Sequence, residues 1–161
     1  KSFAMTGWRL GYIGAPKEIA QACEKLQGQF TSGTNAIAQR AALAALTSDM
    51  KPTQEMADAY KRRRDLVLKM MDEIPGLKTN IPHGAFYVYP NVSYYFGKKS
   101  KETEIKNATD LTFYLLDHAH VALVPGAAFG EDNYIRFSYA TSEEKLTEAL
   151  VRIKTALELL K

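Results

Sequence analysis

The chain has 161 residues, of which 46% are hydrophobic and 24% charged, and its formal net charge is +3. This length allows a domain with a buried core, and the composition is ordinary for a soluble globular protein. Cys23 is the single cysteine, which excludes an intrachain disulfide and fits a reducing, cytoplasmic compartment.

Charge, hydropathy and histidine spacing argue against several classes of partner. The densest basic cluster, Lys61–Arg64, is short and is followed at once by Asp65, so we expect a solvated helix face and no nucleic-acid binding. No apolar run is long enough to span a bilayer, and we expect no membrane partner. His83, His118 and His120 have no ligand partners at useful spacing, so we expect no metal.

The first third of the chain reads as a short apolar run followed by two helices. Leu10–Ala15 is apolar, bounded by small residues and strand-like. Pro16 stands where a helix can begin, and Lys17–Gln29 has helical character. Thr31–Asn35 is expected to be a loop that ends in a helix cap, before an Ala- and Leu-rich helix over Ala36–Leu46.

Apolar residues at helical spacing predict one long amphipathic helix over Thr53–Ile74, which Pro75 and Gly76 end. The expected strands that follow are Leu77–Ile81, Ala85–Tyr89, Val121–Val124 and Tyr134–Tyr139. Asn91–Thr109 is polar and reads as a surface loop before a helix over Asp110–His118. A capping box over Thr141–Glu144 is expected to start the final helix. A domain boundary is most plausible near residue 50.

The first twelve residues, Lys1–Tyr12, hold one lysine and one arginine in a stretch otherwise poor in charge. Two such cations alone would indicate only a surface loop. Their order among small and apolar residues resembles the lysine-site signature of class I and II aminotransferases, above all the bacterial-type aspartate aminotransferases. The positions that match this signature are Lys1, Ala4, Met5, Gly7, Arg9, Leu10 and Gly11.

The resemblance implies a pyridoxal 5′-phosphate (PLP) site. Lys1 would bond covalently to the cofactor and act as the catalytic base, since an amine is both a nucleophile and a proton acceptor. Arg9 would bind the PLP phosphate, because a planar, permanently charged fork suits phosphate oxygens. Gly7 and Gly11 would let the backbone turn and pack close to the cofactor.

A second segment, Tyr134–Thr141, agrees with this resemblance. Arg136 lies inside an alternating aromatic strand, and the bland interpretation is an arginine at a strand edge that reaches to water. In the aminotransferases the similar arginine binds the substrate α-carboxylate, and the resemblance assigns that role to Arg136. Phe86, in Pro82–Val88, resembles a residue near the substrate entrance, with core packing as an equal alternative. Val124–Gly130 resembles the loop before the arginine strand in that family, and its proline and glycines predict a turn.

The implied fold is α/β, the C-terminal part of a fold-type-I PLP-dependent transferase. Residues 1–50 would be the tail of the large PLP-binding domain, and residues 51–161 the small C-terminal α+β domain with a short, mostly antiparallel sheet. The chain has no initiator Met, and we expect it to be a fragment that is inactive alone. The intact enzyme would be a homodimer that moves an amino group between an amino acid, with aspartate as one candidate, and a 2-oxo acid.

Two alternatives remain open at this point. Another fold-type-I PLP enzyme, a lyase or synthase, would share the lysine and both arginines. An aminotransferase-like domain of a transcriptional regulator would carry a DNA-binding segment upstream. Substrate side-chain specificity is not readable, because the residues that select it in the resembling family lie largely upstream.

Overall fold

The computed structural model describes residues 1–101 and 103–161. It divides into two compact units, Lys1–Met56 and Ala57–Lys161. The division falls inside the long helix α3 (Lys51–Asp72), which begins where the sequence placed the domain boundary. The assignment of residues 1–50 and 51–161 to a large and a small domain stays a prediction.

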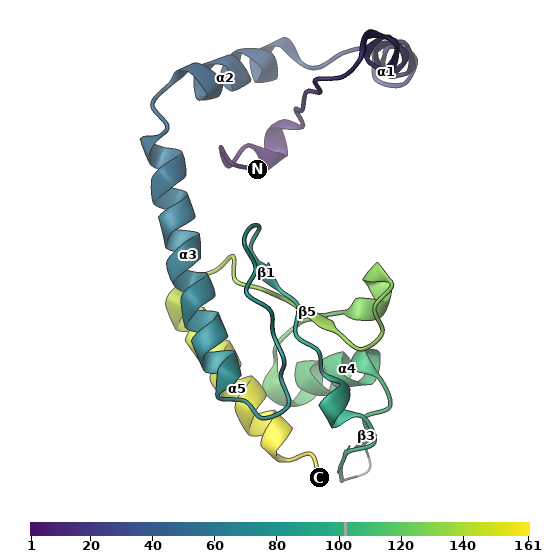
Figure 1. Cartoon of the computed structure of the whole chain (residues 1–161), viewed down its shortest axis with the longest axis vertical. Helices are drawn as coiled ribbons and strands as arrows, with labels where there is room; N and C mark the ends of the chain where they lie inside the picture. Colours follow the sequence, from purple (N-terminus) through teal and green to yellow (C-terminus); the bar gives the residue numbers. More distant parts are fainter. Residues whose placement is uncertain (102) are drawn as a thin grey trace. The chain divides into compact units, whose positions relative to one another are not determined.

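The first unit consists of helices (Figure 1). They are the 3-10 turn η1 (Thr6–Trp8), α1 (Lys17–Phe30), α2 (Ala36–Thr47) and the start of α3, up to Met56. Asn35 caps α2: its side-chain oxygen accepts from the amides of Ile37 at 2.8 Å and Ala38 at 3.2 Å. This confirms the predicted capped loop and both helices to within one residue.

The strand-like run Leu10–Ala15 forms no strand, so that prediction is wrong as far as the structure describes the chain. A strand must satisfy its backbone groups through a neighbouring strand, and the sheets of the described residues lie in the second unit. Apolar content alone therefore did not decide the local structure.

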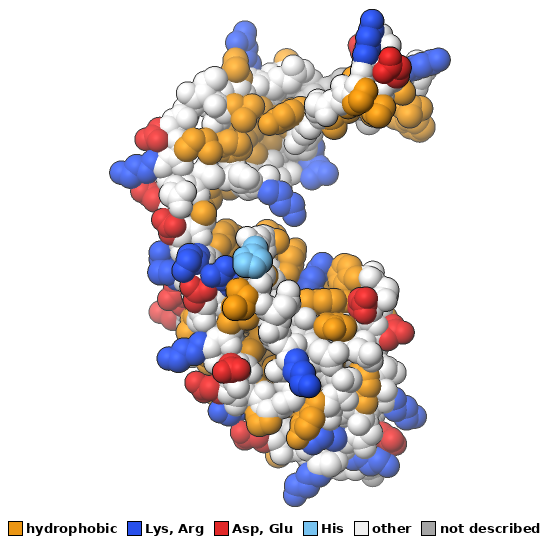
Figure 2. Space-filling view, in the orientation of Figure 1, with side chains coloured by type: hydrophobic (Ala, Val, Ile, Leu, Met, Phe, Trp, Pro, Cys, Tyr) orange, Lys and Arg blue, Asp and Glu red, His pale blue; other side chains and the backbone are white. Residues whose placement is uncertain are grey.

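The helices of the first unit keep most of their apolar side chains at the surface, which Figure 2 shows as hydrophobic patches over α1 and α2. Ala38 is the buried residue of these two helices. The large apolar residues exposed on them are Ile19, Leu26, Phe30, Ile37, Leu43 and Leu46.

The second unit is built around a three-stranded antiparallel sheet in the order β1-β5-β4 (Figure 1). Its strands are β1 (Tyr87–Val88), β5 (Ile135–Ser138) and β4 (Val124–Pro125). The register pairs Tyr87 with Ser138 and Val124 with Arg136. The central position of β5 places Arg136 in the middle of the sheet.

Two segments of this unit, Leu77–Ile81 and Asn91–Thr109, differ from the predicted strand and loop. Leu77–Ile81 makes only an isolated bridge, between Lys78 and Asn91. The segment Asn91–Thr109, expected as a surface loop, contains η2 (Ser93–Tyr95), β2 (Lys99–Ser100) and β3 (Thr103–Glu104). It also buries apolar side chains, since Val92, Tyr95 and Ile105 belong to the core.

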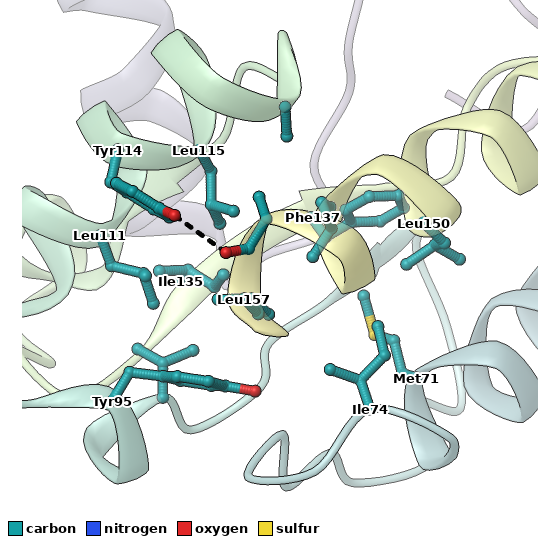
Figure 3. Close-up of a cluster of buried hydrophobic side chains, with 14 of the residues drawn as sticks. Met71, Ile74, Tyr95, Leu111, Tyr114, Leu115, Ile135, Phe137, Leu150 and Leu157 are labelled. Atoms are coloured by element: carbon teal, nitrogen blue, oxygen red, sulfur yellow. Dashed lines mark hydrogen bonds between the residues drawn. The ribbon is translucent and has the colours of Figure 1, made fainter. Parts of the chain in front are cut away.

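Helices α3, α4 (Ala108–Ala119) and α5 (Glu143–Glu158) supply much of the remaining core. Figure 3 shows Leu111, Leu115, Leu150 and Leu157 directed into it with the strand residues. The Tyr114 hydroxyl donates to the Ala156 carbonyl at 2.9 Å, so α4 and α5 are joined by a buried hydrogen bond as well as by packing.

The start of α5 differs from the predicted capping box. The cap is Ser142, whose hydroxyl accepts from the Lys145 amide at 3.4 Å. Thr141 lies one residue outside the helix, so the Thr141–Glu144 pairing is wrong by one position. Glu143 and Glu144 lie in the first turn, where negative charge is favourable.

Candidate functional site

Arg136 lies on the central strand, β5, between two buried residues. Ile135 and Phe137 point into the core, and Arg136 is half-buried, because successive strand side chains alternate between faces. The strand-edge interpretation of Arg136 is therefore wrong: β5 has a hydrogen-bonded neighbour on each side.

Two aromatic rings contact the Arg136 guanidinium. Its central carbon lies 4.5 Å from the centroid of the Tyr87 ring and 4.5 Å from that of the Phe129 ring. Both distances are within the range of cation–π attraction. Among residues 1–101 and 103–161, no carboxylate pairs with this guanidinium and no acceptor takes a hydrogen bond from it. Its planar set of donors is thus available to an external anion.

The Phe129 ring is carried by η3 (Gly126–Phe129), a turn held from several sides. The Tyr89 hydroxyl donates to the Gly126 carbonyl at 3.3 Å, and the Tyr89 ring stacks on Tyr134 with centroids 5.1 Å apart. Burial is the main cause that raises the pKa of Tyr89 above its ordinary value, and the nearby Glu131 adds to this increase. The positive charge of Arg136 acts in the opposite direction. Tyr89 therefore keeps its proton and its role as donor at neutral pH.

Lys1 and Arg9 lie in a separate turn, in the first unit, and both are exposed. The Arg9 guanidinium donates to the Thr6 carbonyl at 3.0 Å, and the Ala4 amide donates to the Lys1 carbonyl at 3.0 Å. Ala4 and Arg9 adopt left-handed backbone, with φ of 54° and 51°. Such conformations cost energy outside glycine and cluster at functional sites.

The turn conformation differs from the expectation for the two glycines. A Cβ added at Gly7 or Gly11 would meet no atom of this chain within 4 Å, and the left-handed residues are Ala4 and Arg9 instead. Close packing of Gly7 and Gly11 against a cofactor stays a prediction. The donors themselves fit PLP, because one exposed turn offers a primary amine for its aldehyde and a guanidinium for its phosphate.

Phe86 packs within the second unit. Its ring stacks on Tyr60 of α3, with centroids 5.8 Å apart, and lies 4.5 Å from the Tyr87 ring. Its carbonyl accepts from the Tyr139 amide at 2.9 Å. A role for Phe86 at the substrate entrance stays a prediction.

Tyr87 and Phe129 are the residues at Arg136 that sequence reasoning did not select. Alternation along the Ala85–Tyr89 strand predicts opposite faces for Phe86 and Tyr87, but it does not show which residue of another strand lies beside Tyr87. No such regularity marks Phe129, because its position depends on the path of the η3 turn.

Comparison with known proteins assigns these features to a family. The model of the aminotransferase class I and II family matches residues 1–153. The chain belongs to this family. The PLP lysine signature and the arginine strand that pointed to the family both lie inside the matched range.

Individual relatives agree with the family match. A bifunctional aspartate aminotransferase and glutamate/aspartate-prephenate aminotransferase of Petunia hybrida is 48% identical, over 100% of this chain and 34% of that protein. An aspartate aminotransferase of Rhizobium meliloti strain 1021 is 45% identical over 98% of the chain and 39% of its own length. The chain thus spans little more than a third of these relatives.

Solved structures show the same fold. The crystal structure of the Rhizobium meliloti aspartate aminotransferase matches with a TM-score of 0.96 at 44% identity, over 100% of this chain and 40% of that one. An aromatic aminotransferase from Pyrococcus horikoshii matches with a TM-score of 0.89 at 40% identity, over 98% of this chain and 41% of its own. The fold is therefore that of part of a fold-type-I transferase, as the sequence predicted.

The described residues contain neither a membrane-spanning helix nor a cluster of metal-binding side chains. No helix among them has the length and apolar character needed to cross a membrane. No group of three or more His, Cys, Asp or Glu side chains within the same residues is arranged to hold a metal ion.

Proposed function

We propose that the intact protein is a PLP-dependent aminotransferase that moves an amino group between an amino acid and a 2-oxo acid. The observation that carries this proposal is Arg136, a half-buried guanidinium whose described surroundings contain two aromatic rings and no anionic partner. The aspartate aminotransferases among the relatives support aspartate as a candidate substrate. Their names favour amino transfer over the lyase, synthase and regulator alternatives.

Arg136 is proposed to bind the substrate α-carboxylate. Its fork can give two parallel hydrogen bonds to the two carboxylate oxygens, and charge-assisted bonds of this kind are the strong ones. A carboxylate held at two points cannot rotate freely, so the rest of the substrate is oriented. Phe86 is carried forward as a candidate substrate contact.

Lys1 and Arg9 are proposed to hold the cofactor, Lys1 through its side-chain amine and Arg9 through the phosphate. When bound, PLP supplies an aldehyde that takes up the substrate amine and a ring that accepts the electrons of the broken Cα–H bond. Lys1 then serves as the base that takes and returns the substrate α-proton. Both side chains are exposed in this chain and are accessible for these roles.

The proposal extends to the state of the intact protein. A homodimer is expected from the family, and sedimentation of the purified protein would test it.

A cytoplasmic location is supported by Cys23, an exposed free thiol, since such thiols persist in reducing compartments.

The test uses the intact protein with aspartate and 2-oxoglutarate, and identifies the products. We expect oxaloacetate and glutamate to appear together, and Lys1→Ala to abolish their formation. Arg136→Ala is expected to raise the KM for both substrates by about 100-fold or more, the equivalent of two lost charge-assisted hydrogen bonds.

Arg62→Ala is the matched control, because Arg62 is exposed and its ion pair with Glu143, at 3.8 Å, is a long one. Its KM values should stay close to those of the parent protein. Release of ammonia or of a decarboxylated product would overturn amino transfer in favour of another PLP reaction. An unchanged KM in Arg136→Ala would remove the carboxylate role.

A further inference from the structure

We propose that Tyr87 and Phe129 are positioning residues, whose rings hold the Arg136 guanidinium in place and thereby set the affinity for the substrate carboxylate. This inference rests on the proposed function, because it takes Arg136 to be the carboxylate receptor. It concerns a different question, namely how a long and flexible side chain is kept ready for its ligand.

The first argument is the choice of neighbours around Arg136. An arginine side chain has many rotamers, and ordering it costs free energy. Acidic residues or carbonyls could order it, but they would occupy the same hydrogen-bond donors that a substrate needs. Aromatic rings attract the guanidinium through their π faces. They leave its in-plane N–H groups free to donate to a substrate. The two 4.5 Å contacts, together with the lack of an acceptor among the described residues, meet this requirement.

The second argument is that Phe129 contributes little to the core. Its side chain is 49% exposed, so it contributes less to burial than the residues of the core cluster, to which it does not belong. It nevertheless has a defined place, because the Tyr89 ring meets it edge-on at 6.3 Å with an interplanar angle of 82°. The Phe129 ring is thus half exposed and held in place by Tyr89, and one of its faces is available to Arg136.

The third argument is the construction of the η3 turn that carries Phe129. A Cβ on Gly126 would lie 2.0 Å from the Glu131 carbonyl oxygen, 2.5 Å from that of Tyr134 and 2.7 Å from the Tyr89 hydroxyl. Gly130 closes the turn with φ of 81°. The sequence predicted a turn at these positions. The turn also places the Phe129 ring against the Arg136 guanidinium.

Tyr87 approaches from the neighbouring strand. The β1–β5 register pairs it with Ser138, two residues from Arg136, so the two side chains are diagonal neighbours on one face of the sheet. The Phe86 ring, 4.5 Å away, packs against Tyr87. Each ring at Arg136 therefore has its own support.

The experiment measures how the intact protein binds a carboxylate and its neutral counterpart. Butyrate and butyramide have similar size, and neither has an amino or 2-oxo group to react. Inhibition constants for both are obtained in the parent protein and in Phe129→Leu, Phe129→Tyr, Tyr87→Leu and Tyr87→Phe. Phe113→Leu is the matched control, since Phe113 on α4 is 62% exposed and is not one of the two rings that contact Arg136.

Loss of either ring is expected to weaken butyrate binding by about 3- to 10-fold, in keeping with a partly exposed cation–π contact, and to leave butyramide binding unchanged. The KM for the amino acid should rise by the same factor, with a smaller change in kcat. Phe129→Tyr and Tyr87→Phe retain a ring and should retain butyrate affinity, as should Phe113→Leu.

Arg136→Lys separates the two proposals. If it lowers the preference for butyrate while both leucine variants leave that preference unchanged, the positioning role is refuted and the proposed function stands. If Arg136→Lys itself leaves the preference unchanged, the carboxylate role of Arg136 is refuted. An equal loss of butyrate and butyramide binding in the leucine variants would show general damage to the fold, and would also overturn the positioning role.

Discussion

Tyr95 illustrates how a single buried group makes stability depend on pH. Its side chain lies in the core, and its hydroxyl donates to the Pro75 carbonyl. Burial, with a smaller contribution from Tyr94, raises the pKa of Tyr95 from 10.0 to about 12. A pKa that is higher in the folded than in the unfolded chain means that Tyr95 contributes stability which is fully present below pH 10 and is lost as the pH rises toward 12.

We therefore predict that the urea midpoint of unfolding falls over this alkaline range, and that Tyr95→Phe reduces the fall. Tyr12→Phe is the control, since Tyr12 is 84% exposed. Equal alkaline slopes in the parent protein and Tyr95→Phe would contradict the assignment.

The residues at the arginine site show how far sequence reasoning reaches at this scale. Arg136 was identifiable because a cation inside an apolar, alternating strand is unusual. Tyr87 and Phe129 were not, because their proximity to Arg136 depends on strand register and on the path of a turn. Neither property is written in the spacing of residues along the chain.

At the scale of elements, the start of α5 offers a sharp test of helix capping. The Ser142 hydroxyl accepts from the Lys145 amide, and Thr141 lies one residue before this cap. Ser142→Ala is predicted to lower the free energy of unfolding by about 0.5–1 kcal/mol, and Thr141→Ala by clearly less. Chemical denaturation of both variants measures the difference, and the reverse order would restore the predicted capping box.

The packing of α4 can be tested with two neighbouring leucines. Leu115 is fully buried, whereas Leu116 is 44% exposed. Leu115→Ala is predicted to destabilise the fold by about 2–5 kcal/mol, because it removes buried apolar surface and leaves a cavity. Leu116→Ala should cost far less, and similar losses in thermal denaturation of both variants would place the core on the wrong face of α4.

The helices were predicted more faithfully than the strands for a physical reason. A helix satisfies its hydrogen bonds within one segment, so periodic apolar residues such as those of α3 and α5 suffice to indicate it. The strands of the second unit have two to four residues each, and a strand exists only where a partner lies alongside. Leu10–Ala15 and Leu77–Ile81 had the composition of strands. In the described chain the first has no partner strand, and the second has a single bridge, between Lys78 and Asn91.

At the scale of the whole molecule, the two units differ in how much they bury. The core cluster lies entirely in Ala57–Lys161, whereas α1 and α2 bury only Ala38. We predict that the amides of α1 and α2 in this chain exchange hydrogen faster than those of α4 and α5, because local opening costs less where few apolar contacts are lost. Hydrogen exchange read by mass spectrometry tests this, and equal protection of both helix pairs would contradict it.

The family could be recognised from two motifs, yet the motifs describe only part of an enzyme. The family match extends over residues 1–153, while the chain covers 34% and 39% of the two relatives compared by sequence. Side-chain specificity could not be predicted, because the two matching segments concern the cofactor and the substrate carboxylate and do not identify the residues that select the side chain.

Gly126 limits how this protein can diverge. Even the methyl group of alanine would collide with two backbone oxygens and a tyrosine hydroxyl, so we expect single substitutions at this position to be strongly destabilising. Ala127 and Ala128, which are exposed, remain open to change. Variation near the arginine should therefore accumulate at these two positions, around an invariant glycine.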